Sequence, residues 1–413
     1  MWSQYTGMTQ YDITIIGGGI VGAASAYKIQ KKHPNLKILL VEKENRLSAH
    51  QTGHNSGVIH SGLYYTPGSK KAVNCMKGRE EIVAFAKEHG IEHDVCGKVV
   101  VATDEAEIPY MEKIMETGKI NGLTGLKLLT GEEVKEIEPE VESIGGIWVP
   151  QTGIIDYVGA TVKMGELVTQ INPESKILLG EKALEFIKGD GVSTLVTDKG
   201  EYKTRKFIFC AGLQADRMAR KDGIDLKERV VGFRGDYYML TDEAKHKVKN
   251  LIYPVPNPAF PFLGVHFTRM HNGDIECGPT AVFTFKREGY SRTDFSLRDT
   301  VEALGYAGTW KMFFKNMKFG IDEQRRAFSK RLFLKTLQRI IPSLTMDDLK
   351  PGGSGVRALL LRQDGDTKDD FRIITNEHAI HVLNAPSPAA TACLAIGDDI
   401  LEMAETHFDF LKK

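Results

Sequence analysis

Residues 12–42 read DITIIGGGIVGAASAYKIQKKHPNLKILLVE and contain the pattern that decides the fold. The β-branched run 12–16 predicts a buried strand that stops at a glycine-rich turn, and residues 23–32 predict a helix that ends before Pro34. Residues 37–41 predict a second buried strand. Because parallel strands joined by a helix require a right-handed crossover, the segment predicts the start of a doubly wound α/β domain.

Three glycines in this turn have separate physical roles. Gly17 permits a tight turn, Gly19 lets the backbone approach a pyrophosphate, and Gly22 lets helix and strand pack closely. The helix that follows offers free amides and a partial positive charge to phosphates. Glu42, at the end of the second strand, is placed to hydrogen-bond a ribose hydroxyl. The segment therefore predicts an adenine dinucleotide site.

NAD and FAD share this fingerprint, so the choice between them depends on the residues that follow. Residues 50–62 (HQTGHNSGVIHSG) are small and polar, with glycines spaced so that backbone can approach a flat ligand, and a flavin fits that pattern. The run Cys210-Ala211-Gly212, after a predicted strand, is a second place where only small residues fit beside a cofactor. From both segments we expect cofactor contacts by Thr52, His54, Asn55, Ser56, Gly57, Ala211 and Gly212.

Length and composition exclude several classes of protein. The 413 residues, 42% hydrophobic and 26% charged, predict two or three folded units with a large core. The 54 Lys and Arg balance the 54 Asp and Glu, so we expect no nucleic-acid partner. Five scattered cysteines indicate neither a disulfide framework nor a zinc site, and the pair His50 and His54 lacks a third ligand, so no metal is expected.

The sequence also bears on membranes and targeting. No segment approaches the roughly 20 apolar residues of a membrane-spanning helix. The first eleven residues lack the features of a signal peptide and of a mitochondrial presequence. We expect a cytoplasmic protein or a peripheral protein of the inner membrane, and a mitochondrial one if the source is eukaryotic and the chain is trimmed.

Longer motifs carry a resemblance over almost the whole chain. In these motifs the chain resembles the L-2-hydroxyglutarate dehydrogenase/oxidase family, within the D-amino-acid-oxidase superfamily of FAD enzymes. The motifs are residues 50–65 (HQTGHNSGVIHSGLYY), 233–237 (FRGDY), 253–256 (YPVP), 261–266 (PFLGVH), 285–290 (FKREGY), 355–358 (GVRA) and 384–391 (NAPSPAAT).

The resemblance implies FAD as cofactor and a chain that passes between two domains more than once. We expect a doubly wound, Rossmann-like FAD-binding domain made of residues 1–90, 150–229 and 345–413. Residues 91–149 and 230–344 should form an α+β substrate domain with a mixed or antiparallel sheet. The resemblance adds Lys43, Pro388, Ala389, Ala390 and Thr391 to the expected cofactor contacts.

The activity that the resemblance implies is oxidation of L-2-hydroxyglutarate, a small dicarboxylate, to 2-oxoglutarate. The electrons would pass to a quinone of the respiratory chain or to dioxygen. Two alternatives stay open: an amino-acid oxidase of the glycine or sarcosine type on the same fold, and a flavin-binding protein without turnover. Covalent attachment of FAD, through His54, and the oligomeric state are left open as well.

Oxidation of a 2-hydroxy acid requires a base for the hydroxyl proton, and histidine is the usual choice because its neutral form is present at working pH. The candidates are His60 and His266. His60 directly follows the glycine segment expected at the flavin. His266 lies in the apolar run 262–267, where a hydrogen-bonded core histidine is the ordinary alternative.

A dicarboxylate calls for two cationic groups, and the planar guanidinium of arginine matches a carboxylate. Arg357 is the first candidate for the carboxylate beside the reacting carbon, because superfamily members use an arginine in the corresponding Gly-x-Arg turn. Arg234, Lys286 and Arg287 are candidates for the distal carboxylate. Tyr64 and Ser387 are expected to line the same pocket.

Residues 308–341 combine basic and aromatic side chains. They include nine Lys or Arg and only Asp322 and Glu323 as acids, with Trp310 and several phenylalanines between them. This composition is typical of helices that lie on an anionic lipid surface, where the protein could reach quinone. A solvated basic face over a packed aromatic core is the equal alternative.

Overall fold

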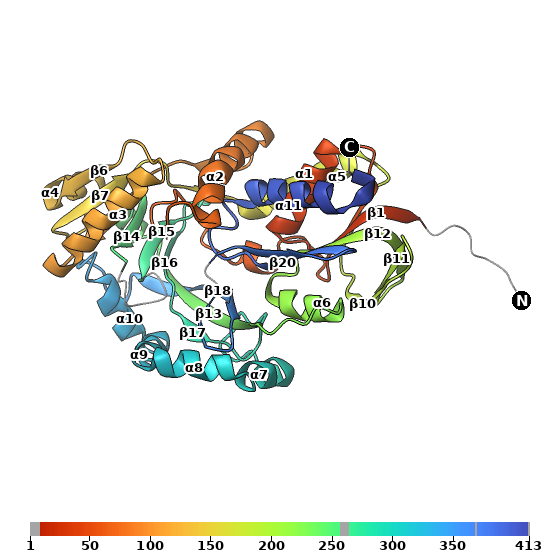
Figure 1. Cartoon of the computed structure of the whole chain (residues 1–413). Coiled ribbons are helices and arrows are strands. Elements are labelled where there is room, and N and C mark those ends of the chain that lie inside the picture. Colours follow the sequence, from red (N-terminus) through yellow and green to blue (C-terminus); the bar gives the residue numbers. More distant parts are fainter. Residues whose placement is uncertain (1–8, 257–263, 368–369, 412–413) are drawn as a thin grey trace, which may run out of the picture.

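The computed structural model describes residues 9–256, 264–367 and 370–411, and this part of the chain contains three β-sheets. Two large sheets lie side by side, each covered by its own helices (Figure 1). The smallest sheet joins β3 (Val58–Ile59), β8 (Gly153–Ile155) and β4 (His93–Asp94). The fold class is confirmed: a doubly wound half is joined to a half built on a mixed, mostly antiparallel sheet.

The eight-stranded sheet forms the nucleotide-binding half. Its central strands run parallel, as the βαβ pattern predicts, and its β10–β11 ribbon is antiparallel. Along the sheet the order is β10-β11-β12-β1-β2-β9, and β20 extends it by pairing with β12 and β19. The strands are β1 (Gln10–Ile16), β2 (Ile38–Val41), β9 (Lys176–Leu178), β10 (Ala183–Ile187), β11 (Ser193–Thr197), β12 (Glu201–Phe209), β19 (Arg372–Thr375) and β20 (Ala379–Asn384).

Helices cover this sheet because its strands are apolar on both faces. Ile13 and Ile15 of β1 are fully buried, in one cluster with residues of α1 (Ile20–Lys32), α5 (Tyr157–Ile171) and α11 (Cys393–His407). The predicted strand at 12–16 and helix at 23–32 are confirmed, although α1 begins three residues earlier. The same half contains α2 (Lys70–His89) and α6 (Ala215–Lys221).

The glycine turn packs too closely for side chains. A Cβ on Gly22 would lie 2.0 Å from the Gly17 carbonyl oxygen, and one on Gly17 would lie 2.3 Å from the Cys210 carbonyl oxygen. Gly17 also has φ +113°, a left-handed conformation that L side chains rarely adopt. The turn between β1 and α1 therefore needs these glycines for its shape.

The nine-stranded sheet forms the second half. Its order is β17-β13-β16-β15-β14-β5-β7-β6, with β18 paired to β13. All its pairs are antiparallel except β14 with β5. The strands are β5 (Lys98–Ala102), β6 (Lys127–Thr130), β7 (Gly145–Val149), β13 (Arg229–Leu240), β14 (Leu251–Pro254), β15 (His266–Arg269), β16 (Ile275–Gly278), β17 (Val282–Phe283) and β18 (Leu349–Leu361).

Two sequence-based expectations are corrected by these sheets. The boundary expected at residue 345 is wrong, because β18 pairs along its whole length with β13 and so belongs to the second sheet. Residues 176–188, which the local sequence pattern predicts as one strand, contain two strands, β9 and β10, on different edges of the first sheet. Both errors have the same cause: the local sequence pattern predicts where a strand lies, but it does not show which distant strand it pairs with.

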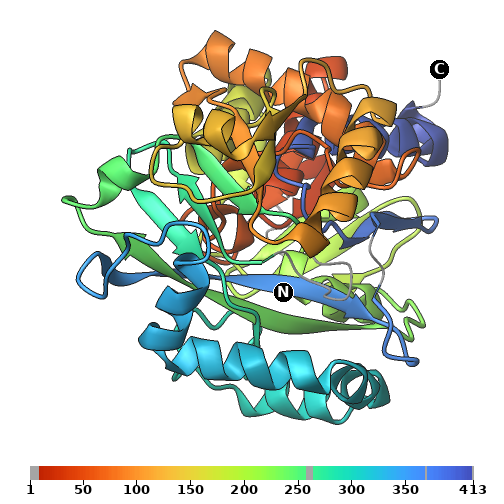
Figure 2. The same cartoon turned by 90° about the vertical axis from the view of Figure 1, so that its left-hand side faces the viewer.

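Helices complete the second half. At the end remote from the first sheet lie α3 (Ile108–Ile120) and α4 (Gly131–Ile137). The helical region expected up to residue 341 is confirmed, and in the rotated view its helices run across the lower edge of the molecule (Figure 2). These helices are α7 (Leu297–Leu304), α8 (Ala307–Lys315), α9 (Met317–Phe328) and α10 (Lys330–Leu337).

Candidate active site

The carboxyl ends of β1, β2 and β12 meet at the glycine turn, where a doubly wound sheet binds its ligand. Gly19 caps α1 without any side-chain bond, and the first turn of α1 holds no acid. The Ile20 amide donates to Thr52 Oγ1 at 3.0 Å. The Glu42 carboxylate accepts from the amides of Gly18 (2.7 Å) and Glu44 (3.0 Å), which holds it at this turn. An open helix N-terminus beside a fixed carboxylate fits the pyrophosphate and ribose of FAD.

Residues 50–57 wrap beside this turn. Asn55 donates to the carbonyl oxygens of Gln51 and Thr52 and accepts from the Gly57 amide, which shapes the segment locally. His54 Nδ1 donates to the Ser354 carbonyl oxygen at 3.0 Å, and its ring stacks on Tyr290 with centroids 3.7 Å apart. Burial lowers the pKa of His54, so it stays neutral.

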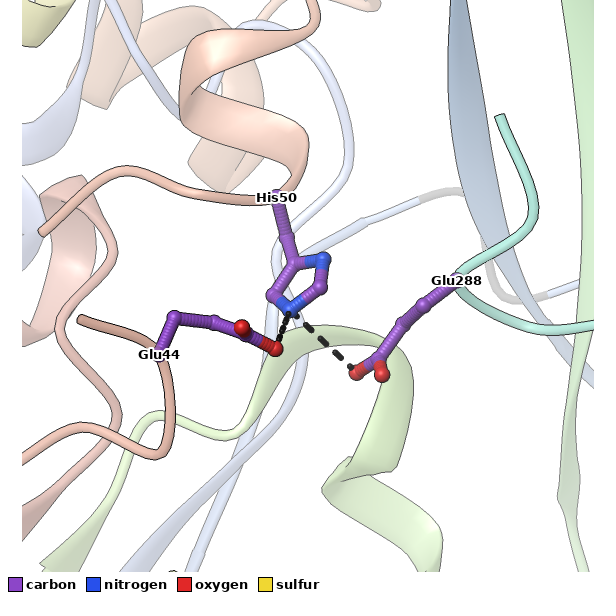
Figure 3. Close-up of side chains that lie close together, drawn as sticks. All are labelled: Glu44, His50 and Glu288. Carbon is purple, nitrogen blue, oxygen red and sulfur yellow. Dashed lines mark hydrogen bonds and ion pairs between the residues drawn. The ribbon is translucent and has the colours of Figure 1, made fainter. Parts of the chain in front are cut away.

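Lys43 lies at the centre of a polar cluster on this edge. The cluster consists of Glu44, His50 and Glu288 (Figure 3), whose ligand atoms lie within 4.8 Å of one another. The Lys43 ammonium lies 2.9 Å from Glu44, 2.9 Å from His50 Nε2 and 2.7 Å from Glu288. It occupies the position that a metal ion would take. Lys43, a predicted cofactor contact, ties the end of β2 to the loop after β17 through Glu288.

The C-terminal segment 388–391 lies against the strand that leads to His60. Thr391 Oγ1 accepts from the His60 amide at 3.0 Å and lies 2.8 Å from the Tyr157 hydroxyl. Ser387 Oγ lies 3.3 Å from His60 Nε2. Segments more than 300 residues apart in sequence therefore fix the backbone and ring of one candidate base. Ala211 and Gly212 follow β12, close to the glycine turn.

His60 and His266 belong to one electrostatic cluster. Burial, followed by electrostatic interactions with Lys98, His266 and Lys71, lowers the pKa of His60 to about 3. Burial also lowers the pKa of His266 to about 4, against a hydrogen bond to Gly264, while Arg357 and Lys98 act in the same direction as burial. Both imidazoles are therefore neutral near pH 7.

The protonation of the two rings differs. His266 Nδ1 lies 2.8 Å from the Gly264 carbonyl oxygen, and only an N–H can donate to a carbonyl. The neutral ring thus carries its proton on Nδ1 and a lone pair on Nε2. For His60 the contact is with a hydroxyl, which leaves either tautomer open. His266 is 7% exposed and stacks on Tyr253 at 4.1 Å.

Lys98 is the residue of this cluster that the sequence analysis missed. It begins β5, is 1% exposed, and lies over the rings of Tyr64 (4.6 Å) and Tyr253 (4.8 Å). A lysine before Val99 to Ala102 looks like an ordinary solvated strand end. The sequence feature that could have identified it is a lysine directly before the continuous apolar strand 99–102, which would place its charge next to the core.

The expected cationic residues separate into two groups. Arg357, on β18, acts electrostatically on His266 and Tyr237 and donates weakly to the Thr280 carbonyl oxygen at 3.5 Å. Tyr64 lies under Lys98, with its hydroxyl 3.3 Å from the ammonium. Arg357, Tyr64 and Ser387 are thus brought together with both histidines.

Arg234, Arg287 and Lys286 do not join them. Arg234 pairs with Asp236 (2.6 Å), and the buried Arg287 pairs with Asp216 and Glu302. Lys286 acts on Asp294 at the surface loop. For the two arginines, these pairings with internal carboxylates argue against the role expected at the distal carboxylate.

A cavity of about 440 Å³ is lined among others by Tyr64, Tyr65, Lys71 and Arg362, and it adjoins the cluster through Tyr64, which contacts Lys98. This volume is in the range that small-ligand sites occupy. Titratable groups with strongly shifted pKa values next to a cavity identify a candidate active site. The arrangement suits an anionic substrate, since it brings the buried Lys98 and the partly buried Arg357 near a neutral imidazole.

Comparison with known proteins agrees with this geometry. The family described as FAD dependent oxidoreductase (DAO) matches residues 12–403. An L-2-hydroxyglutarate dehydrogenase of Indibacter alkaliphilus is 45% identical over 401 residues, covering 96% of this chain and 100% of that protein. One from Escherichia coli (strain K12) is 41% identical (96% and 93% covered), and a mitochondrial one from Nematostella vectensis is 42% identical (96% and 91%).

Among solved structures, the FAD-bound L-alpha-glycerophosphate oxidase from Mycoplasma pneumoniae aligns with a TM-score of 0.77 at 22% identity, covering 96% of this chain and 95% of that chain. Glycine oxidase from Geobacillus kaustophilus aligns with a TM-score of 0.70 at 14% identity, covering 95% of each. These two show the fold, and the full-length relatives confirm the resemblance found in the sequence. The chain therefore belongs to the DAO family of FAD-dependent oxidoreductases and, within it, to the family of the L-2-hydroxyglutarate dehydrogenases.

Proposed function

We propose that this enzyme oxidises L-2-hydroxyglutarate to 2-oxoglutarate and passes the electrons to a membrane quinone. The observation that carries the proposal is the match along nearly the whole chain to L-2-hydroxyglutarate dehydrogenases. The cationic cluster of Lys98 and Arg357 around His266 supports an anionic substrate. FAD, when bound, supplies the acceptor for the hydride.

His266 is the base that we assign to the substrate hydroxyl. Its Nδ1 proton is held by the Gly264 carbonyl oxygen, so Nε2 can accept a proton without rearrangement. Burial lowers the pKa of the ring and keeps it neutral, and the neighbouring positive charges of Arg357 and Lys98 act in the same direction. They also favour departure of the hydroxyl proton, because they stabilise negative charge on the substrate oxygen. His60, bonded to Ser387, then lies beside the substrate as a polar contact.

Arg357 is the residue that we assign to the carboxylate next to the reacting carbon. It projects from β18 opposite Phe233 of β13, in the centre of the long two-stranded ribbon. The charge of Arg357 lowers the pKa of His266, so the two side chains interact electrostatically. A carboxylate bound by Arg357 would therefore bring the adjacent carbinol carbon to the base. The rigidity of a paired strand favours accurate placement.

The helices α7 to α10 form the surface that we assign to the membrane. Within residues 9–256, 264–367 and 370–411, no helix is both long and apolar enough to cross a bilayer. Several large apolar side chains of these helices are nevertheless exposed to solvent: Phe328 is 75%, Phe314 70% and Leu297 69% exposed. Together with the basic residues of 308–341 they fit an anionic lipid surface. Electrons would leave the enzyme there for a quinone.

The substrate assignment is tested by an anaerobic spectrum. L-2-hydroxyglutarate should bleach the yellow flavin of the holoenzyme, whereas the D enantiomer, L-glutamate and sarcosine should not. Steady-state rates with an artificial quinone check the same order of substrates. Bleaching by an amino acid but not by the hydroxy acid would contradict the proposal, and an equal response to the D enantiomer would contradict the assigned handedness.

Replacement of Arg357 tests the first carboxylate contact. Arg357→Met should lower kcat/KM by about 100-fold or more, since a charge-assisted contact in a low-dielectric site is lost, while FAD stays bound. The measurement combines steady-state kinetics with the flavin-to-protein absorbance ratio. Arg298→Met, at an exposed position on α7, is the control. Wild-type kinetics in Arg357→Met would remove this residue from the site.

The pH profile tests the base. Only the unprotonated imidazole accepts a proton, so kcat/KM should rise with pH through about 4 rather than through the ordinary histidine pKa near 6.5. It should fall again above about pH 7, where the neighbouring Lys98, whose pKa burial lowers to about 7, loses its positive charge. In His266→Asn the rate should fall by roughly 100- to 10,000-fold and the acid limb should disappear. If His60→Asn showed this fall in rate and lost the acid limb, while His266→Asn kept a rate near that of the wild type, His60 would be the base.

Vesicle co-sedimentation tests the membrane face. Binding to vesicles rich in anionic lipid should fall at least about 10-fold when Lys311, Lys315, Lys318 and Arg325 are changed to Gln, because each basic residue near the surface contributes about 1 kcal/mol. Phe314→Ser with Phe328→Ser should weaken binding as well. The control changes four exposed lysines elsewhere, Lys113, Lys119, Lys127 and Lys135, to Gln. Equal binding by all variants would contradict the membrane contact and show that these helices form an ordinary solvent-exposed face.

A further inference from the structure

Lys98 is a buried cation in a strand that is otherwise apolar. It begins β5, where it pairs with Leu251 of β14 and Val149 of β7. Its side chain is 1% exposed, and the four residues after it, Val99 to Ala102, are completely buried. Placing an ammonium group in such a position costs free energy that an apolar side chain would not.

The surroundings of Lys98 satisfy this charge only in part. The ammonium has the Tyr64 hydroxyl at 3.3 Å and the faces of Tyr64 and Tyr253 below 5 Å. Among the described residues, no carboxylate forms an ion pair with it. Burial consequently lowers the pKa of Lys98 to about 7. A buried lysine without an acid is expected where a ligand supplies the negative charge.

Lys98 and Arg357 act on the same imidazole. Both charges lower the pKa of His266. The ring of Tyr253 connects Lys98 to this imidazole, because it stacks on His266 and also lies under the Lys98 ammonium. Lys71 acts on His60 but is not among the charges that shift His266. With Arg234 and Arg287 paired to internal carboxylates, Lys98 is the cation best placed for a second anionic group near the base.

We propose that Lys98 binds the carboxylate of the substrate that is remote from the reacting carbon, while Arg357 binds the adjacent one. The assignment rests on the proposed function and gives it a basis for selectivity. A dicarboxylate satisfies both cations, whereas a monocarboxylate leaves the Lys98 ammonium buried and without a counter-ion. Lys98 thereby makes the site select L-2-hydroxy dicarboxylates over L-2-hydroxy monocarboxylates of similar size.

The first test is ligand binding to the oxidised holoenzyme. Glutarate and butyrate, which lack the hydroxyl and do not react, are titrated while the flavin absorption spectrum is followed. In Lys98→Met the Kd of glutarate should rise about 100-fold, whereas the Kd of butyrate should change less than about 3-fold. Lys127→Met, an exposed lysine of the same sheet, should bind both ligands as the wild type does.

The second test compares rates and stability. For Lys98→Met, kcat/KM for L-2-hydroxyglutarate should fall by the same factor as glutarate affinity, and that for L-2-hydroxybutyrate should stay within a few-fold. Its Tm should rise, because an uncompensated buried charge is removed without loss of volume. Lys98→Gln, which keeps a polar donor, should show the same selectivity change if the methionine variant folds poorly.

The outcomes separate this inference from the proposed function. Unchanged glutarate affinity in both variants, or equal losses for glutarate and butyrate, overturns the role of Lys98 at the distal carboxylate. A wild-type enzyme that binds glutarate but oxidises no 2-hydroxy dicarboxylate overturns the proposed function, while the effect of Lys98→Met on glutarate still decides the inference.

Discussion

The burial of Lys98 against two tyrosine rings is the interaction on which the chemistry of the site depends. Burial is the main reason why the pKa values of His60 and His266 are lowered, and the charge of Lys98 acts in the same direction on both through a medium from which water is largely excluded. A neutral histidine is a competent base, and a buried cation is a ready counter-charge for an anion. The same desolvation that lowers the stability of the fold prepares the site for its substrate.

The two halves of the molecule supply different parts of this site. The second sheet contributes Lys98, Tyr253, His266 and Arg357 from four of its strands, which fixes their relative positions. The nucleotide-binding half contributes His60 and Ser387, whose side chains lie within hydrogen-bond distance of each other, and Thr391 holds the His60 backbone. Ion pairs join the halves at their border, Lys43 with Glu288 and Arg287 with Asp216. The site is therefore built where the two halves meet, and its geometry depends on how they are held together.

The amphipathic helices lie at one edge of the second half, which separates the proposed lipid contact from the strands that hold the substrate groups. The exposed aromatic residues of α8 and α9 are not needed to cover the sheet, since Phe333, Leu334 and Leu337 of α10 are buried there. These helices thus stabilise the sheet through α10 and through Ala303 and Met312 of α7 and α8, and leave other apolar side chains of α7, α8 and α9 exposed. That division is the physical basis for assigning them to an anionic membrane.

The nucleotide-binding βαβ unit was predictable from the chain alone, because glycine spacing, a β-branched run and the acid Glu42 act over short distances. His60, His266 and Arg357 were also identified in this way, and the fold brings them together. The pairing of Arg234 and Arg287 with Asp236 and Asp216, the place of β18 beside β13 and the burial of Lys98 are visible only in the folded molecule. Each of these depends on partners brought together by folding, and the burial of a charge is a property of its surroundings rather than of its neighbours in the chain.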